Sequence, residues 1–126
     1  MLNKEVIQKI IELNLNDREM LDAIFDALND FEEYHHAIYE METRIKVYSG
    51  DTSDREEYLR LKQTLDTTRT RRHNLVISDV AMLNRIAKNC GLDPVYDDVI
   101  SEEQPYRRNL ANAVLDYVAD VITNRR

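Results

Sequence analysis

Acidic residues and histidines lie close together in one short stretch, EEYHHAIYE. Glu32 and His35 have the Glu-x-x-His spacing found on the helices of di-iron bundles, and Glu33 and His36 repeat it. Side chains with this spacing lie on one helix face, where they can bind a metal ion or act as acid and base. Together with His73, they suggest a metal-binding or hydrolytic helical bundle as one hypothesis.

The rest of the sequence does not complete such a site. A di-iron bundle needs a second Glu-x-x-His pair and further inward glutamates, but His73 and Asp79 stand on different helical turns. Arginines near the histidines would also repel a cation. Gly50 and Gly91 are the only glycines, which excludes a glycine-rich phosphate loop. We therefore favour a non-catalytic protein over an enzyme, and we expect no catalytic residue, no metal and no cofactor.

A short basic cluster, Arg69, Arg71 and Arg72, offers a third kind of chemistry, because arginines can contact phosphates. A nucleic-acid-associated factor is the corresponding hypothesis. The formal net charge of the chain is −7, which disfavours general nucleic-acid binding because phosphate contacts dominate such affinity. We therefore do not expect nucleic acid among the partners.

Length and composition restrict the elements that must position these residues. The 126 residues suit one domain, 1–126, and the two glycines and two prolines predict few, long elements. Cys90 is the only cysteine, so no intramolecular disulfide can form, which fits a reducing cytoplasm. We see no signal peptide and no membrane span, so we expect a cytoplasmic protein without a membrane partner.

Apolar residues recur at every third or fourth position in four stretches, which predicts an all-α protein. In the segment SGDTSD, Gly50 suits the end of one helix and Ser53 the start of the next. The two long helices should therefore form an antiparallel hairpin about 50 Å long. The four helices are expected over about 3–13, 17–48, 54–90 and 105–124.

The first and last helices join the chain at the open end of this hairpin, so they can cover only that end. Residues at about 38–66 should project as a two-helix arm with a narrow apolar seam of the coiled-coil type. Such an arm buries little surface alone. We therefore predict a helical bundle that forms homo-oligomers through helical surfaces, with the arm available to a protein partner. The function that we favour is a protein-interaction or regulatory module.

Opposite charges should meet halfway along the hairpin. The stretch 17–42 contains nine acids and one base, whereas 66–73 contains three arginines and one acid. A turn near residue 51 pairs positions whose numbers sum to about 102, so Phe31 should face Arg71. We predict a polar layer that helps to fix the register of the two helices. Its expected members are Glu32, His35, Arg69, Arg72 and His73.

Two long segments of the second half share a distinctive pattern: RRHNLVISDVAMLNRIAKNCGLDPVY and, after it, QPYRRNLANAVLDYVADVI. The pattern is a helix, a Gly-Leu-x-Pro-x-Tyr break and a helix preceded by Arg-Arg. Over about residues 71–122 the chain resembles a small all-helical bacterial family of unknown function. The resemblance implies a bacterial or mobile-element origin and no established activity. The first half has no such counterpart, which would make the arm peculiar to this protein.

Overall fold

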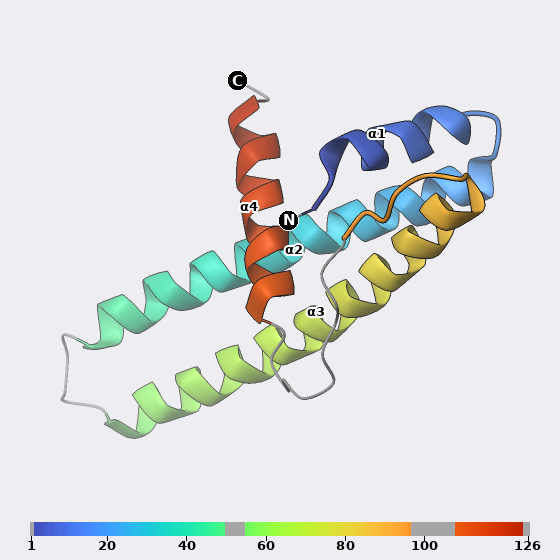
Figure 1. The fold of residues 1–126 in the computed structure, drawn as a ribbon. Coiled ribbons are helices and arrows are strands. Elements are labelled where there is room, and N and C mark those ends of the chain that lie inside the picture. Colours follow the sequence, from blue (N-terminus) through green and yellow to red (C-terminus); the bar gives the residue numbers. More distant parts are fainter. Residues whose placement is uncertain (1, 50–54, 97–107, 125–126) are drawn as a thin grey trace.

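The computed structural model contains four helices in the part of the chain that it describes, residues 2–49, 55–96 and 108–124 (Figure 1). The predicted all-α fold with an antiparallel hairpin is confirmed, and every end of the two long helices lies within one residue of its predicted position. The expected turn residues Gly50 and Ser53 lie outside the described residues. The helices are α1 (Lys4–Leu13), α2 (Arg18–Ser49), α3 (Arg55–Asn89) and α4 (Arg108–Asn124).

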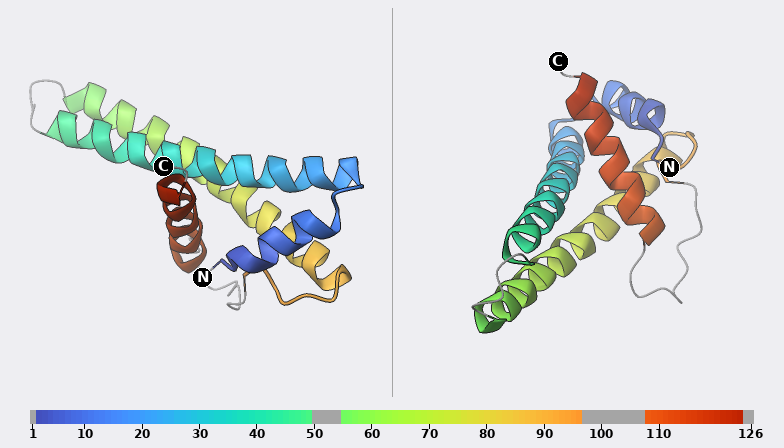
Figure 2. Two further views of the ribbon diagram at one scale, coloured as in Figure 1. Left: turned by 90° about the horizontal axis from the view of Figure 1, so that it is seen from above. Right: turned by 90° about the vertical axis from the view of Figure 1, so that its left-hand side faces the viewer.

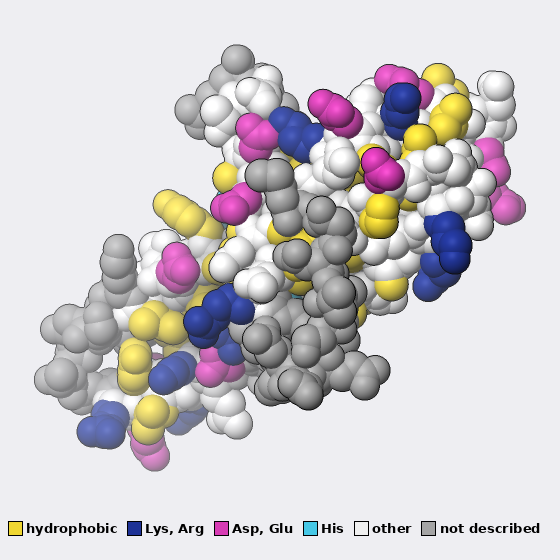
Figure 3. Space-filling view, in the orientation of Figure 1, with side chains coloured by type: hydrophobic (Ala, Val, Ile, Leu, Met, Phe, Trp, Pro, Cys, Tyr) yellow, Lys and Arg dark blue, Asp and Glu magenta, His cyan; other side chains and the backbone are white. Residues whose placement is uncertain are grey.

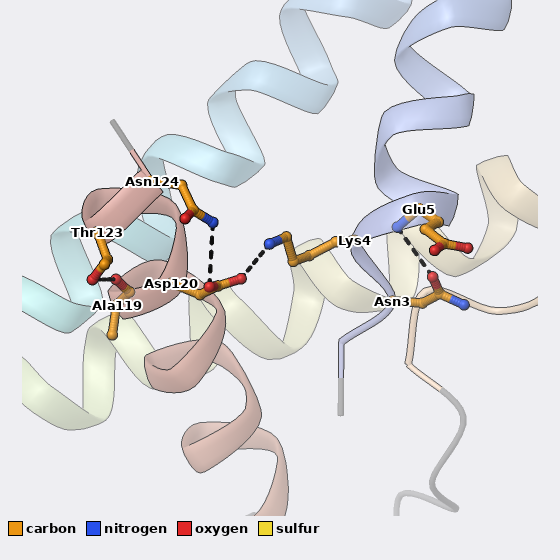
Figure 4. A network of polar contacts seen from close by, with 7 residues as sticks. All are labelled: Asn3, Lys4, Glu5, Ala119, Asp120, Thr123 and Asn124. Atoms are coloured by element: carbon orange, nitrogen blue, oxygen red, sulfur yellow. Dashed lines mark hydrogen bonds and ion pairs between the residues drawn. The ribbon is translucent and has the colours of Figure 1, made fainter. Parts of the chain in front are cut away.

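Local capping explains where several helices begin and end. The Oδ1 atom of Asn3 accepts hydrogen bonds from the backbone N–H groups of Glu5 and Val6, which would otherwise have no partner at the start of α1. Figure 4 shows the bond from Glu5. Gly91 has a φ of 72°, a left-handed conformation that glycine adopts without strain, and it follows the end of α3. These are short-range effects, which is why the sequence predicts the helix ends well.

The long hairpin of α2 and α3 is the central element of the fold, and the two shorter helices pack on it. Helix α1 packs against α3 over the open end of the hairpin, and helix α4 packs against α2 and crosses the hairpin near its middle (Figures 1 and 2). Phe31 of α2 and Tyr117 of α4 meet edge to face, with ring centroids 6.3 Å apart. The side chains that are almost completely buried include Ile10, Ile24, Phe31, Tyr34, Val76, Val80, Leu83, Leu110, Val114 and Val118.

Beyond α4 the ends of α2 and α3 run side by side without cover from α1 or α4 (Figure 2). Among the side chains whose burial is described, Tyr34 is the last buried one on α2 and His73 is the first on α3. Between them, no side chain described at 35–45 or 55–72 is fully buried. We call residues 38–45 and 55–66 the arm. Its helices have one helical neighbour each, so their apolar residues stay partly exposed.

Candidate functional site

An open groove of about 390 Å³ lies at the junction between the core and the arm. It gathers four residues of the predicted sites: Glu32, Glu33 and His36 from α2, and Arg72 from α3. Most of its lining comes from α2 and includes three glutamates, and Arg72 is the only lysine or arginine among the described lining residues. The full lining is Asn29, Glu32, Glu33, His36, Ala37, Glu40, Thr68 and Arg72.

An ion pair closes one side of this groove. The Nη1 atom of Arg72 lies 2.5 Å from Oε2 of Glu33, so the pair joins α3 to α2. The side chains keep 34% and 50% of their surface exposed, and exposed pairs of this kind typically contribute about 0.2–1 kcal/mol. An acid of α2 therefore meets an arginine of α3, as the charge pattern suggests, and the acid in this pair is Glu33.

Directly beside the ion pair, His73 and Tyr34 meet inside the protein. The Nδ1 atom of His73 lies 3.3 Å from the Tyr34 hydroxyl, and the two ring centroids are 5.7 Å apart. Tyr34 is completely buried and His73 is 3% exposed. The predicted polar layer did not include Tyr34, although its hydroxyl group contacts His73. The signal for it was its place in the apolar stripe of α2, three residues after Phe31.

The predicted register of the hairpin is wrong by about one turn of α3. Glu33 pairs with Arg72 and Tyr34 with His73, so the numbers sum to 105 and 107 rather than about 102. Phe31 therefore does not face Arg71, which is exposed. The physical reason is geometric: in an antiparallel hairpin an error of one residue in the centre of the turn shifts the pairing by two.

The other two arginines of the basic cluster have different surroundings. The Nη2 atom of Arg69 lies 3.9 Å from Oδ1 of Asp66, one turn earlier on α3. Arg71 lines a separate open groove of about 670 Å³ along α3, which it shares with Lys62. The structure thus does not gather the three arginines into one basic patch, because Arg72 faces α2 while Arg71 lies on another side of α3.

The candidate metal ligands are also divided. His73 is in the core, His36 is exposed in the groove and His35 is half-buried. In the described ranges of the chain, no group of three or more histidine, cysteine, aspartate or glutamate side chains is arranged to hold a metal ion. The Glu-x-x-His spacing therefore has no partner on another helix there.

A contact between two aspartates was not foreseen from the sequence. The carboxyl group of Asp79 on α3 lies within hydrogen-bonding distance of that of Asp30 on α2. Burial of Asp79, the hydrogen bond and charge of Asp30, and the charge of Asp26 together raise the pKa of Asp79 from 3.8 to about 7. The register error hid this contact, because the sequence pattern paired the acids of α2 with arginines only.

The described helices define a small all-α protein built on a long antiparallel hairpin with a polar junction between core and arm. The chain belongs to the family described as "Protein of unknown function (DUF3232)", whose model matches residues 2–126. The resemblance seen in the second half is thereby confirmed and extends to the first half, so the matched region includes the arm. No curated protein and no solved structure matches the chain. Within the described residues, none of the helices combines the length and the apolar character needed to cross a membrane.

Proposed function

We propose that the protein is a non-catalytic helical interaction module that self-associates through its arm. The observation that carries the proposal is the partial exposure of the apolar side chains in the arm. They lie along the contact between α2 and α3, and none of those described is fully buried. The half-buried apolar side chains along this seam are Ile38, Met41, Ile45, Tyr58, Leu61 and Leu65.

A second copy of the chain is the partner that suits this surface best. Two helical hairpins that pack seam to seam form a four-helix bundle, in which positions that are half-buried in one hairpin become core. Tyr39 and Leu59, which are 67% and 51% exposed, add apolar surface to the same arm, and the proposed contact with a second copy covers them as well. Hydrophobic side chains are visible over this end of the molecule (Figure 3).

The charges of the arm support an association driven by apolar burial. Arg44 pairs with Glu40 on α2, and Arg60 pairs with Glu57 on α3, at spacings of four and three residues. Both pairs lie within one helix, so they neutralise charge locally and do not depend on a partner. The self-association should therefore tolerate salt, because screening weakens charge pairs and leaves apolar burial in place.

The oligomeric state in solution tests this proposal. Light scattering after gel filtration should give a mass that is a multiple of the 14.9 kDa chain. Leu59→Glu, in the arm, should shift the protein toward the monomer because it places a charge in the apolar contact. Leu15→Glu is the matched control, since Leu15 is 62% exposed and precedes α2 at the opposite end of the hairpin. A wild-type protein that stays monomeric at high concentration would contradict the proposal.

The cellular setting is part of the same proposal. The single cysteine, Cys90, is half-buried and free, which agrees with the reducing cytoplasm where we propose that the module works. Self-association could then present the groove beside Arg72 or another helical surface to a further protein, which would give the module a regulatory role. Pull-down with the wild-type chain and with Leu59→Glu would show whether partner binding requires the oligomer.

A further inference from the structure

Asp30 and Asp79 bring two carboxyl groups together across the contact between α2 and α3. The Oδ2 atom of Asp79 is shielded from solvent, and no donor in the described part of the chain reaches it. Ionised carboxylates only accept hydrogen bonds, so two of them in contact repel each other. A proton retained by one of the groups converts this repulsion into an O–H···O hydrogen bond.

The surroundings offer this pair no neutralising base. Asp26, one turn before Asp30, adds a further negative charge from α2. No lysine or arginine occurs at 19–43 on α2 or at 73–84 on α3. Of the nearest bases on α3, Arg72 pairs with Glu33, His73 contacts Tyr34, and the side chain of Arg85 is exposed to solvent.

The remaining helices do not change this balance. Helix α1 packs against α3, and its charged side chains, Lys4, Glu5, Lys9 and Glu12, are all exposed to solvent. Helix α4 packs against α2, and its described charged side chains, Arg108, Asp116 and Asp120, are exposed as well. The proton is therefore the partner that can relieve the repulsion between the two carboxyl groups.

We propose that Asp30 and Asp79 form a proton-dependent clasp between α2 and α3. The clasp is closed when the two carboxyl groups share a proton and is loosened when both are ionised. In the closed clasp the proton lies between the two carboxyl groups, so both residues are needed to form it. The clasp is a property of the hairpin within one chain and does not depend on self-association.

The direction of the pH dependence follows from the raised pKa of Asp79. The folded protein holds the proton up to about pH 7, whereas an ordinary aspartate in the unfolded chain loses it near 3.8. Between these values the folded state binds more protons than the unfolded state, so stability falls as the pH rises. Above the folded pKa both states are ionised, and this contribution to the pH dependence ends.

Urea unfolding at pH 5.5 and pH 8, at one protein concentration, tests the clasp in the full chain. The unfolding equilibrium constant of the wild type should be about tenfold larger at pH 8, a value below the full linkage effect because Asp79 is only partly buried. Asp79→Asn should remove most of this difference, since the amide donates a hydrogen bond to Asp30 at either pH. Asp22→Asn, which changes an exposed acid of α2, should retain the wild-type pH dependence.

The histidines are the same in every variant, so the comparison between variant and wild type isolates the clasp. A second measurement needs no substitution: the side-chain carboxyl carbons of Asp30 and Asp79 can be followed by NMR as the pH changes. The carboxyl group of Asp79 should titrate near neutral pH. The proposal is overturned if the carboxyl group of Asp79 titrates below pH 5, or if Asp79→Asn keeps the full pH dependence of the wild type.

Discussion

The Tyr34 hydroxyl lies 3.3 Å from Nδ1 of His73, at the point where the buried core of the hairpin ends. Toward the open end, α1 and α4 cover the hairpin, and toward the closed end no described side chain is fully buried. The contact therefore marks the boundary between a well-packed region and the arm. A buried polar pair at such a boundary favours one register of α2 against α3. A shift of one helix along the other would separate the two polar groups and remove their hydrogen bond.

Removal of the Tyr34 hydroxyl should weaken the core end of the hairpin. We expect Tyr34→Phe to lower the free energy of unfolding by about 1 kcal/mol, because a buried hydrogen bond is lost while the ring is kept. Urea unfolding followed by circular dichroism measures the change. Tyr39→Phe is the matched control, since Tyr39 is 67% exposed, and it should change stability by less than 0.5 kcal/mol, a typical limit for surface substitutions. Equal effects of the two substitutions would argue against a specific role of the contact.

The ion pair between Glu33 and Arg72 should contribute little to stability. A double-mutant cycle with Glu33→Gln and Arg72→Ala should give a coupling free energy of about 0.2–1 kcal/mol, because both side chains are partly exposed. The coupling should shrink in 1 M salt, where charges are screened within about 3 Å. A coupling above 2 kcal/mol would mean that the pair is far less hydrated than its exposed surface indicates.

Gly91 should be required for the break after α3. We expect Gly91→Ala to destabilise the protein by about 1 kcal/mol, because a residue with a Cβ atom adopts a positive φ only with strain. The Cβ atom itself would meet nothing within 4 Å, so the cost comes from the backbone conformation and not from a clash. Asn89→Ala, at the exposed last residue of α3, is a suitable control that keeps the glycine. Unchanged thermal unfolding of Gly91→Ala would contradict this account.

The parts of this structure that sequence alone could predict are those with local causes. Apolar residues at every third or fourth position and breakers such as Gly91 determine the helices, and both signals can be read within a few residues. The excess of acids on α2 and arginines on α3 likewise indicated that opposite charges meet across the hairpin, and Glu33 with Arg72 is such a pair.

The individual contacts of the candidate site could not be predicted in the same way. The pairs Tyr34–His73 and Asp30–Asp79 depend on the register of α2 against α3 and on the rotation of each helix about its axis. Sequence periodicity shows which face of a helix is apolar, but it does not give the sliding position of one helix along another. An aspartate that faces an aspartate also contradicts the expectation from charge, so only the three-dimensional structure reveals it.

Helix α4 should be held mainly by apolar packing and only weakly by its ion pair with α1. Lys4 joins Asp120 across 116 positions of sequence, and Asp120 also accepts a hydrogen bond from Asn124 (Figure 4). Lys4 and Asp120 keep 47% and 48% of their side chains exposed, so Lys4→Ala should cost less than about 1 kcal/mol. Val118 is 1% exposed, and Val118→Ala should cost about 2 kcal/mol because it leaves a cavity.

Amide hydrogen exchange of α4 measures both changes in the place where they act. Val118→Ala should speed the exchange of the α4 amides by about 30-fold, the factor that corresponds to 2 kcal/mol, provided that α4 opens as a unit. Lys4→Ala should speed it about fivefold or less, and 0.5 M salt should produce a similar small effect in the wild type by screening the pair. If Lys4→Ala released α4 as strongly as Val118→Ala, the ion pair rather than the apolar face would have to anchor this helix.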